Sequence, residues 1–225
     1  MTSCKFDFCR QINYNLTMKT QNCNNNQIFL YLCATNFLSE PVVKHPLRQK
    51  EIDKCSGAKV KAEKYTSWQL LKYATNKHFG LDVDALDFTV SPNGKWNNNQ
   101  FFFSISHSFG LVAVAISTLP VGVDLERYDN PKITDKLAKK VLCNSELALY
   151  ANQSNKREFF VQRWCQKEAL FKCLHSGIFI PNDVDTTAHS NCHTVDFVHN
   201  DKTFCIAVAS DIDCPLQPIF VDDLQ

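Results

Sequence analysis

The 225-residue sequence has only six glycines and two methionines, and it lacks any strong excess of charge of one sign. Its 24 basic side chains are balanced by 23 acidic ones, which leaves a formal charge of +1. We therefore expect no nucleic-acid partner, because domains that bind by neutralising phosphates carry a clear basic excess. The eleven cysteines include no Cys-x-x-Cys pair, so the ligand spacing of a zinc site is also missing.

Long apolar segments are missing as well. The longest uninterrupted aliphatic run, residues 111–116, is far shorter than a membrane span. The first residues, Met1 to Asp7, carry charge where a secretion signal has an apolar core. We expect a cytoplasmic protein with reduced thiols and no membrane partner.

Hydrophobic residues make up 44% of the chain, and the chain length fits one large domain or two compact ones of about 110 residues. Spacing of apolar residues predicts helices over 61–77, 134–141, 145–150 and 157–175. Period-two alternation and apolar runs predict strands over 101–107, 111–117 and 121–126, taken as an antiparallel meander, and over 194–198 and 203–209. This order predicts an α+β fold of two similar halves, residues 1–117 and 118–225.

The strand Val121-Gly122-Val123-Asp124-Leu125-Glu126 is the most informative one. Side chains alternate along a strand, so Asp124 and Glu126 share one face with Gly122, and the apolar residues face the core. Two carboxylates beside a residue without a side chain form a patch of hard oxygens that a phosphate can approach. Mg²⁺ suits such a patch, because it binds one or two carboxylates together with water and substrate phosphate. A solvated strand end is the alternative.

The predicted helix over 157–175 places Trp164, Glu168 and Lys172 on one face. On an exposed helix, a Glu–Lys pair four residues apart contributes only a few tenths of a kcal/mol. Here the neighbours Leu170 and Phe171 leave little of the helix for water. Glu168 and Lys172 therefore need a partner, and an ion or a phosphate would serve.

A third polar group, Ser104-Ile105-Ser106-His107-Ser108, ends a predicted strand before a glycine turn. Hydroxyls and an imidazole at the mouth of a sheet can hold a phosphate. From this stretch alone, a structural or surface role for His107 is the alternative.

In this order and spacing, the three features resemble the Sfp-type 4'-phosphopantetheinyl transferase family. The family pattern is a Gly-[Val/Ile]-Asp strand followed by W-[SC]-x-K-E-[AS]-x-x-K, and residues 164–172 fill every fixed position of the second part. The F-S-I-S-H-S stretch of the family stands unaltered at residues 103–108. Gly94-Lys95 and the segments 63–71 and 138–146 also resemble the family.

The resemblance implies an enzyme that moves the 4'-phosphopantetheine arm of coenzyme A onto a serine of an apo acyl, peptidyl or aryl carrier protein and releases adenosine 3',5'-bisphosphate. It implies Mg²⁺ as the cofactor and a fold whose halves are related by pseudo-twofold symmetry. The N-terminal half would hold the 3'-phosphate side of coenzyme A, and the C-terminal half the metal and catalytic motifs. Two fused halves make an obligate trimer unnecessary, so we expect a monomer.

Carried over residue by residue, the resemblance also implies roles in the site. Asp124, Glu126 and Glu168 are the expected Mg²⁺ ligands, and Glu168 is also the expected base for the carrier serine. Lys172 is expected to act in catalysis by contacting the diphosphate. The residues expected to contact coenzyme A are Lys95, Ser106, His107, Asp124 and Lys172, with Arg48 and Lys64 near the 3'-phosphate and with Lys50 or Lys44 as alternatives to Arg48.

Two other functions fit the residues less well. A Mg²⁺-dependent nuclease places its Glu and Lys two residues apart on a strand, whereas Glu168 and Lys172 are four apart in a helical pattern. A non-catalytic homologue that only binds carrier proteins would be expected to have lost an acidic or lysine position. None of these positions is lost here.

Overall fold

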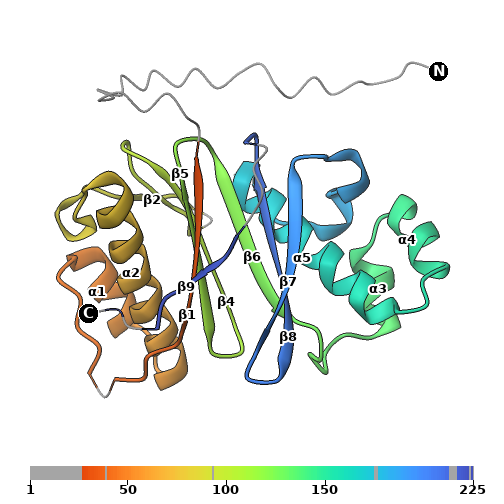
Figure 1. The fold of residues 1–225 in the computed structure, drawn as a ribbon, viewed down its shortest axis with the longest axis horizontal. Coiled ribbons are helices and arrows are strands. Elements are labelled where there is room, and N and C mark those ends of the chain that lie inside the picture. Colours follow the sequence, from red (N-terminus) through yellow and green to blue (C-terminus); the bar gives the residue numbers. More distant parts are fainter. Residues whose placement is uncertain are drawn as a thin grey trace.

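The structure is a computed structural model that describes residues 27–38, 40–92, 94–174, 177–212, 217–222 and 224. Two sheets lie between two groups of helices, as Figure 1 shows. Helix α2 (Ala58–Phe79) covers the first sheet, and helix α5 (Lys156–Leu174) covers the second. The expected α+β class is confirmed. The segment Met1 to Asp7, on which the expectation about secretion depends, lies outside the described residues.

The first sheet has the strand order β4-β5-β1-β9. Strands β1 (Ile28–Ala34) and β4 (Phe102–Ser108) pair antiparallel with the two edges of β5 (Leu111–Ser117), and β9 (Ile219–Phe220) pairs with β1 in parallel. The turn between β4 and β5 has Phe109 and Gly110 at positive φ, as two-residue hairpins require. The short strands β2 (Thr89–Val90) and β3 (Trp96–Asn97) form a separate ladder.

Helix α2 is the predicted helix over 61–77, longer at both ends. Its buried residues Trp68, Leu71 and Ala74 pack on the first sheet, and the short helix α1 (Pro46–Asp53) precedes it in the chain. The helix ends at Gly80, whose left-handed conformation lets its N–H bond the Asn76 carbonyl at 3.0 Å. Within the described residues, no helix is both long enough and apolar enough to cross a membrane.

The second sheet has the strand order β6-β8-β7, and both of its ladders are antiparallel. It comprises β6 (Val121–Arg127), β7 (Cys192–His199) and β8 (Lys202–Ser210). The predicted alternation of β6 is confirmed, because Val121, Val123 and Leu125 enter the core between the two sheets. The opposite face packs under α5, and helices α3 (Asp135–Val141) and α4 (Asn144–Ala151) pack beside the start of α5.

The two halves repeat one plan, as expected. Within the described residues, each half has a strand, then helices and then two long antiparallel strands, and in the second half the short β9 follows. In each sheet the second of the two long strands lies in the middle, β5 between β4 and β1, and β8 between β7 and β6. The boundary between residues 117 and 118 stays a prediction, since β9 pairs with β1 and Val221 enters the core of the first half.

The predicted meander is wrong in its third strand. Strand β6 pairs with β8, because β5 already has a partner along each edge. Instead β6 lies beside β4 and runs parallel to it: Val123 N donates to Ser104 Oγ at 3.0 Å, and Leu125 N donates to Ser106 Oγ at 3.2 Å. Serine hydroxyls thus satisfy backbone donors that a sheet would pair with carbonyl groups.

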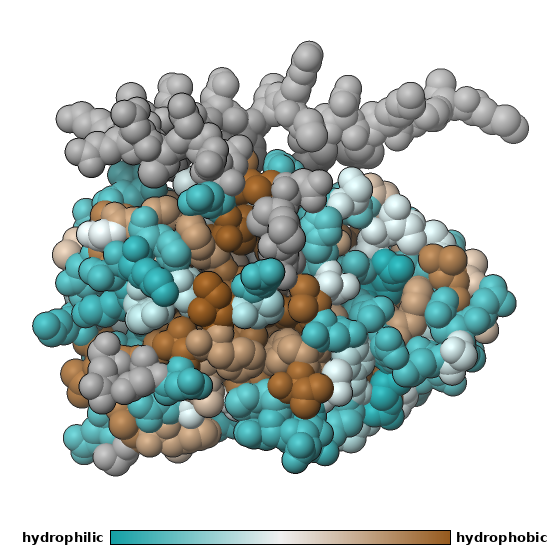
Figure 2. All heavy atoms as spheres, in the orientation of Figure 1, coloured by the Kyte–Doolittle hydropathy of each residue, from teal (hydrophilic) through white to brown (hydrophobic). Residues whose placement is uncertain are grey.

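The face drawn in Figure 2 has its hydrophobic residues gathered in the middle, over the strands, and mostly hydrophilic residues toward the two ends. Strand β9 contributes two exposed hydrophobic side chains to the surface, Ile219 and Phe220. The Phe220 ring packs against Phe197 and His199 of β7, so the C-terminal segment contacts both sheets.

Gly122 decides how closely α5 approaches β6. A Cβ atom on Gly122 would lie 1.9 Å from the Ala169 carbonyl oxygen and 2.6 Å from the Cys173 nitrogen, both in the backbone of α5. The interpretation that this glycine admits a phosphate is therefore wrong, because helix backbone fills the space. The close contact instead places the next turns of α5 against Asp124, two residues along the strand.

A buried ion pair fixes α5 to α4. Lys167 Nζ lies 2.6 Å from Glu146 Oε2, and both side chains are fully buried. Thr186 donates to Glu146 Oε1 from its N–H (3.1 Å) and its hydroxyl (2.7 Å), and Lys167 also donates to the Val184 carbonyl. Burial raises the pKa of Glu146, but the hydrogen bonds from Lys167 and Thr186 outweigh it and hold that pKa below its ordinary value.

Gly122→Ala tests the contact between strand and helix. We expect a loss of about 2–3 kcal/mol in the free energy of unfolding, because two backbone segments would have to separate. Urea denaturation measures this loss. The control is Gly57→Ala, where the nearest atom to the new Cβ lies 4.0 Å away and the loss should stay below about 1 kcal/mol. Equal losses for the two substitutions would contradict the conclusion that Gly122 is needed for the close contact of β6 with α5.

Lys167→Met should lower the free energy of unfolding by about 3–5 kcal/mol at pH 7, because it leaves the Glu146 carboxylate buried and unpaired. The unpaired carboxyl would have a folded-state pKa above its unfolded value, so the deficit should shrink as the pH falls and Glu146 becomes protonated. The double variant Lys167→Met/Glu146→Gln should recover part of the loss. A deficit that stays constant between pH 7 and pH 5 in urea titrations would contradict this account.

Candidate active site

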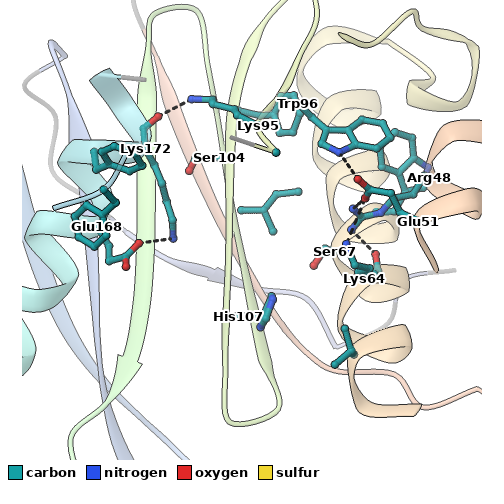
Figure 3. Close-up of a pocket in the computed structure, with 17 residues that line it drawn as sticks. Arg48, Glu51, Lys64, Ser67, Lys95, Trp96, Ser104, His107, Glu168 and Lys172 are labelled. Carbon is teal, nitrogen blue, oxygen red and sulfur yellow. Dashed lines mark hydrogen bonds and ion pairs between the residues drawn. The ribbon is translucent and has the colours of Figure 1, made fainter. Parts of the chain in front are cut away.

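A cavity of about 420 Å³ lies between the two halves (Figure 3). Residues of α1, α2, β3, β4 and α5 line it, so both halves contribute to its wall. Its size falls in the range of small-molecule sites. Six residues predicted from the sequence line this cavity: Arg48, Lys64, Lys95, His107, Glu168 and Lys172.

At one end of the cavity the wall is formed by α5, which packs on β6. Lys172 Nζ lies 2.7 Å from Asp124 Oδ1 and 3.9 Å from Glu168 Oε2, and it donates to the Val123 carbonyl at 3.1 Å. Glu168 and Lys172 share one face of the helix, as their spacing predicted, and Figure 3 shows both side chains on the same side of the cavity. The close approach at Gly122 brings this face of α5 to Asp124.

The pKa values of Lys172 and Glu168 depend on burial and on the neighbouring charges. Burial lowers the pKa of Lys172, but the charges of Asp124 and Glu168 outweigh it and raise that pKa above its ordinary value. Lys172 is therefore a fixed cation. Burial raises the pKa of Glu168, only partly opposed by the charge of Lys172. A carboxyl whose pKa is raised in this way is a better proton acceptor when ionised.

The third predicted metal ligand, Glu126, points along β6 toward other partners. Its Oε1 accepts from Ser108 Oγ at 2.8 Å and from the Arg127 N–H at 2.7 Å, and its Oε2 accepts from Asn130 Nδ2 at 3.3 Å. Glu126 lines a second hollow of about 250 Å³ beside Trp164. The structure thus places Glu126 in the wall of this second hollow, and not in that of the cavity that Glu168 lines.

The ligand atoms of Asp124, Glu126 and Glu168 do not gather within 4.8 Å of one another. Across the described part of the chain, the group of acidic, His or Cys side chains that does so is Cys143, Glu146 and Asp185. Glu146 of that group is already bound to Lys167. At Asp124, in contrast, the ammonium of Lys172 contacts the carboxylate directly, so this carboxylate already holds a cation. The oxygen-only donor set of the three predicted ligands fits Mg²⁺ in its chemistry.

Side chains of the stretch from Phe103 to Ser108 have two different roles. His107 lines the cavity, and its Nδ1 lies 3.4 Å from Glu63 Oε2. Burial lowers the pKa of His107, and the charge of Glu63 opposes this effect. Ser106 does not line the cavity: its buried hydroxyl donates to Asp124 Oδ1 at 2.8 Å and accepts from the Leu125 N–H. In the structure, Ser106 therefore positions Asp124.

Lys95 joins the wall at the same end as Lys172. Its Nζ donates to the Lys172 carbonyl at 2.5 Å, and Figure 3 shows the side chain reaching across the cavity toward α5. Burial lowers the pKa of Lys95 to about 8, and the charge of Lys172 adds to this effect. This contact connects the first half directly to α5.

The opposite end is basic and aromatic, but it also holds an acid. The Arg48 guanidinium lies 5.8 Å from the ring centres of both Trp68 and Trp96. Glu51 Oε2 lies 3.0 Å from Arg48 Nη1 and 3.3 Å from Lys64 Nζ. The basic pair predicted at this end, Arg48 and Lys64, is therefore brought together.

Sequence reasoning missed several residues of the wall, namely Glu51, Trp68, Trp96, Phe171 and Phe179. A signal for Glu51 was available, because it follows Arg48 by one helical turn and so lies on the same face of α1. Phe179 gave no such signal, since it lies in the loop after α5 and is placed by tertiary packing against Trp164 and Phe171.

Residues 120–212 match the family described as the 4'-phosphopantetheinyl transferase superfamily. A 4'-phosphopantetheinyl transferase of Bacillus subtilis is 29% identical over 119 residues, which are 51% of this chain and 52% of that protein. The 4'-phosphopantetheinyl transferase gsp of Aneurinibacillus migulanus is 34% identical over 103 residues, 44% of this chain and 42% of that protein.

The holo-[acyl-carrier-protein] synthase of Thermotoga maritima is 33% identical over 85 residues, 37% of this chain and 50% of that protein. A crystal structure of the synthase of that organism covers 40% of this chain and 62% of its own, at 24% identity and a TM-score of 0.29. The chain spans about half the length of the curated relatives it matches. Residues 120–212 therefore carry the sequence of the 4'-phosphopantetheinyl transferase superfamily, and the resemblance of the chain to Sfp-type members is confirmed.

Proposed function

We propose that this chain transfers the 4'-phosphopantetheine arm of coenzyme A to a serine hydroxyl of an apo acyl, peptidyl or aryl carrier protein. The observation that supports it most directly is the polarity of the cavity between the halves. One end holds Glu168 and Lys172, whose ammonium contacts the buried Asp124 behind the wall, and the other end holds Arg48 and Lys64 beside two indole rings. A substrate with a diphosphate near one end and a nucleotide at the other matches this arrangement.

Mg²⁺ is the proposed cofactor, with Asp124, Glu126 and Glu168 as its ligands. For Glu126, this assignment requires its carboxylate to leave Ser108 and Asn130. When bound, the ion would offset the negative charge of the diphosphate. We also propose that the protein is cytoplasmic and monomeric.

In the proposed reaction, the carrier serine oxygen forms a bond to the phosphorus that bears the pantetheine arm. The bond from that phosphorus to the bridging oxygen breaks, and adenosine 3',5'-bisphosphate leaves with the bond electrons. The serine proton passes to Glu168, directly or through a water molecule, which fits the raised pKa of that carboxyl. Lys172 remains protonated and compensates the charge on the leaving oxygen.

The direct test is mass spectrometry of a panel of apo-carriers incubated with coenzyme A, Mg²⁺ and this protein. We expect one or more carriers to gain the mass of phosphopantetheine at the serine. An unmodified panel in which a known transferase modifies every carrier would contradict the proposal.

Asp124→Asn should lower the transfer rate by at least about 100-fold, because it removes the charge that holds Lys172 and binds the proposed metal. The matched control is Asp129→Asn, which removes one charge from the loop after β6, where Asp129 contacts Arg127 and Lys202. The control should keep nearly full activity. Equal activity of both variants, with unchanged circular dichroism, would contradict the role of Asp124.

Lys172→Met should chiefly lower kcat and change the KM for coenzyme A little, because charge on the bridging oxygen develops only during transfer. Steady-state kinetics separate the two constants. The control Lys202→Met removes an exposed cation that contacts Asp129 outside the cavity. If Lys172→Met raises KM at constant kcat, Lys172 contributes to ground-state binding alone.

A further inference from the structure

Glu51 is the one acid of the described residues at the nucleotide end of the cavity. Both of its carboxylate oxygens are engaged: Oε2 contacts Arg48 and Lys64, and Oε1 accepts from Trp96 Nε1 at 3.1 Å. Figure 3 shows Glu51 directed between Trp96, Arg48 and Lys64. Its side chain is 30% exposed, so a ligand in the cavity can reach it.

Arg48 is poorly accessible to a ligand because its side chain is almost buried, although two hydrogen bonds engage only part of its five N–H donors. Its Nη1 donates to Glu51 at 3.0 Å and its Nη2 to the Lys64 carbonyl at 2.7 Å, while Nε is buried. The side chain is only 9% exposed. Burial lowers the pKa of Arg48, and the charge of Glu51 opposes this effect. Arg48 therefore serves mainly to hold Glu51 and the two tryptophans in place.

Lys64 is the more accessible cation of the pair, with 31% of its side chain exposed. It too contacts Glu51, so the cluster of Arg48, Lys64 and Glu51 carries one net positive charge. A phosphate ester entering this cluster meets one accessible ammonium group and one carboxylate, and the carboxylate repels it. A ribose hydroxyl, in contrast, can donate a hydrogen bond to the same carboxylate.

We propose that Glu51 is a specificity-determining residue, which lets the nucleotide end of the cavity accept a ribose with a free 3'-hydroxyl nearly as well as one with a 3'-phosphate. This inference rests on the proposed function, since it takes coenzyme A as the ligand. It assigns Lys64 to the favourable contact with the phosphate and Glu51 to the opposing one. The site then discriminates weakly between coenzyme A and dephospho-coenzyme A.

The test compares the dissociation constants of coenzyme A and dephospho-coenzyme A by isothermal titration calorimetry of the full chain at fixed ionic strength. For the unmodified protein we expect the two constants to agree within about threefold. Glu51→Gln should shift their ratio toward coenzyme A by about tenfold, which corresponds to about 1.4 kcal/mol. Asp53→Asn is the matched control, because it removes one charge from the exposed side of the same helix and should leave the ratio unchanged.

Lys64→Gln keeps the contact between Arg48 and Glu51 and should shift the ratio in the opposite direction, toward dephospho-coenzyme A. This variant decides the question if Glu51→Gln does not fold. A preference of the unmodified protein for coenzyme A of tenfold or more would overturn the inference. So would a ratio that neither substitution changes while both ligands bind. If neither ligand binds the unmodified protein, the proposed function fails, and the inference fails with it.

Discussion

The contact between Gly122 and the backbone of α5 is the constraint on which the site depends. No side chain other than hydrogen fits there, because a Cβ would lie 1.9 Å from the Ala169 carbonyl oxygen. The approach brings Glu168 and Lys172, on adjacent turns of α5, against Asp124 of β6. The same helix is fixed at its other side by the buried pair of Lys167 and Glu146. Strand, helix and charged cluster therefore form one unit.

Strand β4, which joins the first half to β6 of the second half, contributes another part of the cavity wall. Strands β4 and β6 run side by side, and Ser104 and Ser106 of β4 accept the backbone donors of β6. Side chains alternate along β4, so Ser104 and Ser106 reach β6 from one face of the strand, and Ile105 and His107 lie on the other face. Ser104 and His107 both line the cavity. Ser106 also donates to Asp124, so the strand that joins the halves positions an acid of the site.

Most cations that line the cavity already contact an acid of the protein. Lys172 contacts Asp124, and Arg48 and Lys64 contact Glu51. An anionic ligand must therefore replace these ion pairs with contacts of its own. The net binding free energy then depends on whether each displaced carboxylate finds a new partner. In the proposed function, a metal ion would take over the carboxylates beside Lys172. At the opposite end, Glu51 would keep its negative charge beside the ligand, and for this reason we propose that it influences which ligand binds.

The sequence by itself determined the elements and the chemistry of the motif residues. The periodicities of α5 and β6 were strong, because a helix repeats every 3.6 residues and a strand every two, and they placed Glu168 with Lys172 and Asp124 with Glu126 correctly. Only the tertiary structure decided which strand edges pair and that the backbone of α5 fills the space beside Gly122. It also decided that Ser106 and Glu126 form hydrogen bonds away from the cavity, and that Glu51 contacts Lys64 and Trp96. These outcomes depend on contacts between segments far apart in the chain, and local periodicity carries no information about them.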